Sequence, residues 1–130
     1  MLKLNRIHHI AIICSDYERS KKFYTEVLGF TAIREVYREA RKSYKLDLEV
    51  NGLYQIELFS FPGPPPTRPS QPEALGLRHL AFEVNNIEEA VFHLNECQVI
   101  TEPIRIDETT GKRFTFFTDP DGLPLELYEG

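Results

Sequence analysis

An internal repeat is the feature of this sequence that most constrains its fold. Each half contains a His inside an alternating apolar run, followed by an Asx residue and then a helical stretch. Each half later contains an Asx-Gly turn that leads into a strand with a Glu between apolar neighbours. The interval is 48 residues from His9 to Glu57 and 47 residues from His79 to Glu126. Two similar structural modules are therefore predicted within one chain.

The repeat and a proline-rich segment together predict the domain organisation. Residues 1–130 are expected to form a single domain, with an N-terminal module at about 5–61 and a C-terminal module at about 76–130. Six of the eleven residues in 62–72 are proline, which excludes a helix or a central strand because proline fixes φ and lacks the N–H donor. The segment at about 62–75 is therefore predicted to be an extended linker, which suits pairing of modules within one chain or between two chains.

Each half is predicted to have the element order β-α-β-β-β, which places the chain in the α+β class. The first helix is expected to begin at Ser15 or Asp16 and to end before Gly29, which suits a left-handed residue after a helix. The second helix is expected to begin at Asn86. The first strand of each half contains His9 or His79. Further strands are predicted near residues 31–39, 44–50, 54–61, 104–106, 113–118 and 125–128.

Four side chains are candidates for one metal site: His9, Glu57, His79 and Glu126. Taken singly, a His or Glu in a strand is more often an ordinary core or surface residue, but the repeated pairing favours ligands of one ion. Imidazole and carboxylate together suit Zn²⁺, Ni²⁺ and Fe²⁺, and a cation would neutralise carboxylates in an apolar cleft. His8 is expected to face the opposite way from His9 in a regular strand, and a bulge would make His8 the ligand instead.

The overall charge excludes some classes of partner. Fifteen Lys and Arg against 20 Asp and Glu give a net charge of -5, which argues against nucleic acid or an anionic membrane as the main partner. No apolar run approaches the roughly 18 residues that span a bilayer, and the N-terminus does not resemble a signal peptide. The two cysteines are expected to be free thiols, which predicts a cytoplasmic protein.

Several basic residues are candidates for binding an anionic substrate. Arg38 and Arg41 lie in a segment rich in Arg, Lys and Tyr, and Arg113 lies in a predicted strand. A guanidinium group binds carboxylates and phosphates through two parallel hydrogen bonds. The alternative interpretation is ordinary surface charge on a solvated hairpin.

Taken in order along the chain, these residues resemble the vicinal oxygen chelate superfamily and, within it, the small glyoxalase I-like proteins. The resemblance covers essentially the whole chain. It rests on His9, Asp16, Ser20, Phe23, Tyr24, Leu28, Gly29 and Phe30, on Ile56-Glu57-Leu58, on Gly76 to His79, on Asp119 to Gly122 and on Glu126-Leu127.

The resemblance implies duplicated βαβββ modules whose curved mixed sheets surround a metal cleft, often in a homodimer. It implies one divalent metal ion, with Zn or Ni expected first and Fe, Mn or Co as alternatives. It further implies a lyase or isomerase in which Glu126 or Glu57 takes a proton from a carbon next to a carbonyl and the metal stabilises the enediolate. The expected substrate is a small molecule, either anionic or a thiol adduct.

Other functions within the superfamily remain open from the sequence. An epimerase would use the same proton chemistry, a ring-cleaving dioxygenase would use iron, and a bleomycin-resistance-like protein would bind a small molecule without catalysis. No set of residues that contact glutathione can be identified in this sequence. The identity of the substrate is therefore not predicted.

Overall fold

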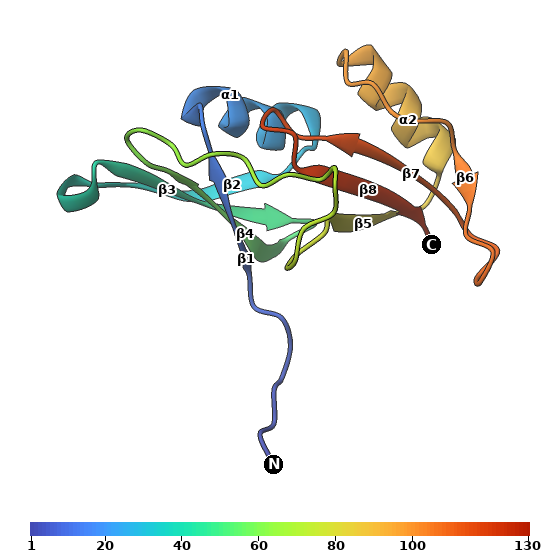
Figure 1. The fold of residues 1–130 in the computed structure, drawn as a ribbon, viewed down its shortest axis with the longest axis horizontal. Helices are drawn as coiled ribbons and strands as arrows, with labels where there is room; N and C mark the ends of the chain where they lie inside the picture. The colour runs from blue at the N-terminus through green and yellow to red at the C-terminus, as the bar shows by residue number, and fades with distance from the viewer. The chain divides into compact units, whose positions relative to one another are not determined.

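The computed structural model describes residues 1–130 and divides the chain into two compact units, Met1–Pro66 and Thr67–Gly130. The boundary lies inside the proline-rich segment. Each unit contains one four-stranded sheet, and in Figure 1 a helix lies over one face of each sheet. The two units are described separately below.

The first unit has the strand order β1-β4-β3-β2. β1 pairs with β4 in parallel, whereas β3 is antiparallel to both β4 and β2. Its elements are β1 (Ile10–Cys14), α1 (Tyr17–Lys22), a π-helical turn η1 (Phe23–Val27), β2 (Thr31–Arg38), a 3₁₀ turn η2 (Glu39–Arg41), β3 (Ser43–Val50) and β4 (Leu53–Ser60).

The second unit repeats this topology with the strand order β5-β8-β7-β6. β5 pairs with β8 in parallel, and β7 is antiparallel to β8 and β6. Its elements are β5 (Leu80–Val84), α2 (Ile87–Glu96), β6 (Arg105–Ile106), β7 (Arg113–Thr118) and β8 (Pro124–Glu129). The prediction of duplicated βαβββ modules with mixed sheets is confirmed.

The helix ends form where the sequence predicts them. The Asp16 side chain accepts a hydrogen bond from the Arg19 backbone N–H at 3.2 Å, and that of Asn86 accepts one from the Glu89 N–H at 3.0 Å. These bonds satisfy amide donors that have no partner within the helix. Gly29 has φ of +77°, the left-handed conformation expected after a helix.

The alternation of side chains along the central strands separates a core face from a polar face. Ile56 and Leu58 of β4 are 2% and 0% exposed and lie on the face that α1 covers, with Glu57 between them on the other face. β8 has the same alternation, with Leu125 in the core and Glu126 on the opposite face. Each sheet therefore packs its helix on one side and presents a glutamate on the other.

Neither cysteine forms a disulfide, and Cys14 is buried whereas Cys97 is partly buried. No helix in the structure has the length and apolar character needed to cross a membrane.

A polar cluster attaches α1 to β2, and it should make stability depend on pH. The Tyr17 hydroxyl donates to Glu35 Oε2 at 2.5 Å and the Lys21 ammonium lies 2.7 Å from the same oxygen. The hydrogen bond from Lys21, followed by that from Tyr17, lowers the pKa of Glu35 below its ordinary value. The stabilisation is therefore fully present above the unfolded-state pKa of about 4.3, and it is lost as the pH falls through the lower native value.

We expect Glu35→Gln to reduce the free energy of unfolding by about 0.5–1 kcal/mol at pH 7, a small value because solvent screens this partly exposed group. Urea unfolding at pH 7 and at about pH 3 should show the difference from wild type shrinking in acid. Glu26→Gln on η1 is the control. A loss of the same size at both pH values would contradict the linkage.

Candidate functional site

The first candidate pair, His9 and Glu57, meets on the polar face of the first sheet. The prediction that His9 lies mid-strand is wrong, because β1 begins at Ile10. Parallel pairing places Ala11 beside Glu57, so the residue two positions earlier can reach back over the strand end. His9 Nε2 lies 3.5 Å from Glu57 Oε2, and Glu57 is 7% exposed.

The second unit repeats this arrangement with His79 and Glu126. His79 likewise directly precedes its strand, since β5 begins at Leu80. Ala81 pairs with Glu126 in parallel register, and His79 Nε2 lies 3.1 Å from Glu126 Oε1. The two units therefore share the order of their elements and also the placement of one His and one Glu side chain.

Glu57 lies in a polar network. The Tyr54 hydroxyl donates to Glu57 Oε2, and Lys45 Nζ lies 3.6 Å from the same oxygen. Asp47 faces Glu57 across the β3–β4 ladder and is paired with Lys45 and Arg34. Burial alone would raise the pKa of Asp47, but the hydrogen bonds from Lys45 and Arg34 outweigh it and lower that pKa. Glu57 is therefore held by a hydroxyl and lies near a cation.

Glu126 has different surroundings. Phe116 faces it across the β7–β8 ladder, in the register position that Asp47 occupies opposite Glu57. The Phe116 ring also lies edge-on to the His79 ring, with 4.9 Å between centroids. The second pair therefore lies against an aromatic wall instead of a polar network.

His8 does not face away from His9. The two Nδ1 atoms lie 2.9 Å apart, and both rings contact Tyr54. The alternation expected in a regular strand does not apply here, because both residues precede β1. The structure places His9, and not His8, against Glu57.

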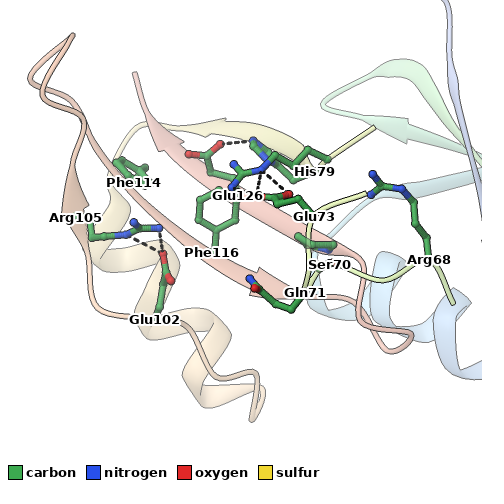
Figure 2. Close-up of a pocket in the computed structure, with 12 residues that line it drawn as sticks. Arg68, Ser70, Gln71, Glu73, His79, Glu102, Arg105, Phe114, Phe116 and Glu126 are labelled. Atoms are coloured by element: carbon green, nitrogen blue, oxygen red, sulfur yellow. Dashed lines mark hydrogen bonds and ion pairs between the residues drawn. The ribbon is translucent and has the colours of Figure 1, made fainter. Parts of the chain in front are cut away.

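A pocket of about 490 Å³ lies within the second unit next to the His79–Glu126 pair (Figure 2). Apart from this pair, its lining combines aromatic and charged side chains. They include Arg68, Glu73, Arg78, Glu102, Arg105, Phe114 and Phe116.

None of the three arginines of this pocket, Arg68, Arg78 and Arg105, was among the sequence candidates. Arg68 lies in the segment predicted to be an extended linker, and Arg105 lies in the two-residue strand β6. The Phe-x-Phe pattern at Phe114 and Phe116 of β7 is the one sequence signal that could have indicated an aromatic wall near Glu126.

The structure places Arg113 outside this pocket. Its Nε and Nη2 atoms donate to the Glu129 carboxylate at 3.1 and 2.8 Å, and its Nη1 donates to Glu88 at 2.6 Å. These bonds, that to Glu129 first, raise the pKa of Arg113. All three guanidinium nitrogens are engaged by carboxylates of its own unit.

The other two predicted arginines lie at the β2–β3 connection. Arg38 Nη2 donates to Ser43 Oγ at 2.7 Å, and its guanidinium carbon lies 4.9 Å from the Phe59 ring centroid and 5.7 Å from that of Phe61. Arg41 is exposed in η2. Arg38 is thus on the same face as Glu57, since its partner Ser43 alternates with Lys45 and Asp47 along β3.

The structure therefore brings the four predicted metal ligands together as two pairs, one in each unit. Neither unit by itself gathers three or more His, Cys, Asp or Glu side chains suited to a metal ion. Each pair supplies one imidazole nitrogen and one largely buried carboxylate, which are donors for a divalent transition metal.

Comparison with known sequences gives one family and several relatives. The model described as Glyoxalase/Bleomycin resistance protein/Dioxygenase superfamily matches residues 6–127. The uncharacterized protein YwkD of Bacillus subtilis is 67% identical over 97% of this chain and 98% of its own length, and the uncharacterized protein YaeR of Escherichia coli is 65% identical over 99% of each. A 2-epi-5-epi-valiolone epimerase of Actinomyces is 26% identical over 93% of this chain and 77% of its own length.

Solved structures agree with the family match. SMU.1112c has a TM-score of 0.91 at 46% identity, covering 98% of this chain and 100% of its own. The glyoxalase family protein from Enterococcus faecalis has a TM-score of 0.86 at 54% identity, covering 95% and 97%. The trypanothione-dependent glyoxalase I of Leishmania major has a TM-score of 0.73 at 29% identity, covering 97% and 87%.

Proposed function

Because the chain belongs to the Glyoxalase/Bleomycin resistance protein/Dioxygenase superfamily, we propose that it is a divalent-metal-dependent, glyoxalase I-like isomerase or lyase that moves a proton at a carbon next to a carbonyl. The carrying observation is the repeated pair of side chains: an imidazole Nε2 lies 3.5 Å from a buried glutamate oxygen in one unit and 3.1 Å in the other. The proposed ligands are His9, Glu57, His79 and Glu126.

The donor set fits a divalent ion. Within each pair, the imidazole nitrogen and the carboxylate oxygen lie 3.5 and 3.1 Å apart, close enough that both would bind one ion. The two carboxylates are largely buried, and buried charge is stabilised by a cation. Imidazole with carboxylate favours Zn or Ni, with Fe, Mn or Co as alternatives. When bound, the ion polarises the substrate carbonyl as a Lewis acid.

Glu126 is the proposed general base. Its carboxylate lines the pocket of the second unit, whereas Glu57 accepts the Tyr54 hydroxyl hydrogen bond and lies near Lys45. A carboxylate that lines a pocket beside an aromatic wall can approach the carbon of a molecule bound there, while one held by a hydroxyl group is better suited to fixed ligation. In this assignment Glu126 moves the proton and Glu57 remains in place.

The second candidate is an epimerase that acts next to a carbonyl. It would use the same glutamate to exchange a proton, and a valiolone epimerase is among the relatives. A dioxygenase or a non-catalytic binding protein has less support, since a site with all four proposed ligands favours neither.

A homodimer and a cytoplasmic location are further parts of the proposal. The linker would allow the two ligand pairs of one site to come from one chain or from two copies of the chain.

Metal content tests the proposed site. We expect the purified, untagged protein to hold about one equivalent of a divalent transition metal per chain, and the His9→Ala, Glu57→Ala, His79→Ala and Glu126→Ala variants each to lose most of it, because each removes one of four donors. Elemental analysis after reconstitution measures this, and His93→Ala on α2 is the control.

The identity of the bound metal distinguishes the isomerase from the oxygenase. Zinc or nickel would favour the isomerase, whereas iron would favour the oxygenase. A wild-type protein that takes up no metal after reconstitution would contradict the proposal, and the chain would then be better described as a binding module.

A further inference from the structure

Three arginines line the pocket of the second unit, and each has unused hydrogen-bond donors. A guanidinium group has five N–H donors on three nitrogens. Arg68, Arg78 and Arg105 each donate to the protein through Nε and Nη2 alone, which leaves the Nη1 group without a protein acceptor. Arg113, outside the pocket, has all three nitrogens engaged.

Two of these arginines are neutralised to different extents. Arg78 donates to both oxygens of Glu73, from Nε at 3.1 and 2.9 Å and from Nη2 at 2.7 Å. Arg105 makes both of its bonds to a single oxygen of Glu102, at 3.0 and 2.5 Å. The Arg105 pair is therefore not the parallel two-oxygen arrangement that guanidinium and carboxylate prefer.

Arg68 is the cation of the pocket that has no ion-pair partner. It donates to the main-chain carbonyls of Ala74 and Leu75, which are neutral. No carboxylate lies within ion-pair distance of its guanidinium group. These bonds fix Arg68 at the end of the pocket opposite Arg105 (Figure 2), so its charge is positioned at the pocket without being neutralised.

An aromatic wall connects Arg105 to the His79–Glu126 pair. The Arg105 guanidinium carbon lies 4.8 Å from the Phe114 ring centroid and 5.8 Å from that of Phe116. The Phe116 ring in turn contacts His79. A bound molecule can therefore place an apolar part on the two rings while its charged end meets a guanidinium group.

We infer that this pocket binds a small oxyanion substrate: a carboxylate or phosphate held by Arg105 at one end of the pocket or by Arg68 at the other, joined to an apolar or aromatic part that packs on Phe114 and Phe116. The volume of about 490 Å³ suits such a small molecule. This inference rests on the proposed function, because it places the reacting carbon of that substrate beside Glu126.

The test measures binding of simple probes to the metal-reconstituted protein by calorimetry. The probes are phenyl phosphate, benzoate and, as the uncharged control, benzyl alcohol. The variants are Arg68→Gln and Arg105→Gln, with Arg19→Gln on α1 as a control that makes the same change of charge. Arg68→Lys keeps the charge, and circular dichroism establishes that each variant is folded.

We expect phenyl phosphate or benzoate to bind the wild type and to bind one of Arg68→Gln and Arg105→Gln at least about tenfold more weakly, the effect of losing a hydrogen bond to a charged group. The weakened variant identifies the arginine that holds the anion. Arg19→Gln should bind like the wild type, and Arg68→Lys should lie between if Arg68 is that arginine. The anion with the higher affinity distinguishes a phosphate ester from a carboxylic acid as substrate.

Metal content in the same samples separates this inference from the proposed function. Anion binding that depends on Arg68 or Arg105 in a protein that takes up no metal would support the pocket while the enzyme proposal fails. Undiminished anion binding in both Gln variants, no binding of either anion to the wild type, or equally tight binding of benzyl alcohol would overturn the inference.

Discussion

Replacing Glu126 by Gln should lower turnover of a 2-oxoaldehyde–thiol adduct by about 10²–10⁴-fold, the range that general base catalysis contributes. The amide keeps the shape of the side chain and one ligand oxygen, but it cannot take a proton from carbon. We therefore expect the variant to retain most of its metal and to lose its activity. Product formation followed by NMR in metal-reconstituted protein, together with elemental analysis of the same sample, measures both quantities.

Glu57→Gln is the matched comparison for this experiment. Glu57 is the equivalent residue in the other unit, and it is held by the Tyr54 hydroxyl group, so its replacement should reduce turnover less than Glu126→Gln when the metal is present. The reverse order would assign the proton transfer to Glu57. Unchanged turnover in Glu126→Gln with metal retained would remove Glu126 from the chemistry.

Truncation of Leu58 to Ala should reduce the free energy of unfolding by about 2–5 kcal/mol, the cost of lost burial and of the cavity left behind. Leu58 is fully buried in β4, on the face that α1 covers. Urea unfolding at neutral pH measures the loss, which should appear as a lower midpoint with a similar slope.

Leu53→Ala on the same strand provides the control, because Leu53 is 60% exposed. Its effect should stay within about 0.5 kcal/mol, as is usual for surface substitutions. If the two variants lost similar stability, the division of β4 into a core face and a polar face would be wrong. That division also places Glu57 on the polar side.

The topology followed from local patterns in the sequence. The Asx-Gly turns and the Glu between apolar neighbours predicted the strands β4 and β8, and the capping residues Asp16 and Asn86 marked where both helices begin. These signals act between neighbouring residues, through the two-residue period of a strand and the unsatisfied amides of a helix end. A chain that repeats them in the same order is therefore expected to repeat the same module.

The positions of the two histidines could not be predicted as well. Both were expected inside a strand, and both lie immediately before one. Strand ends depend on where backbone pairing stops, which is set by the neighbouring strand and not by the residues themselves. The contact between His8 and His9 has the same origin, since side-chain alternation ends where the strand begins.

By itself, the sequence determined the duplicated α+β architecture and the four candidate metal ligands, because periodicity and spacing are local or repeated properties. Only the tertiary structure decided which histidine meets each glutamate, and that Arg68 and Arg105 rather than Arg113 line the pocket beside Glu126. The sequence does not show whether the hydrogen-bond donors of an arginine are already bound by carboxylates in the folded protein. Its availability depends on residues far along the chain, such as Glu88 for Arg113, that folding brings alongside it.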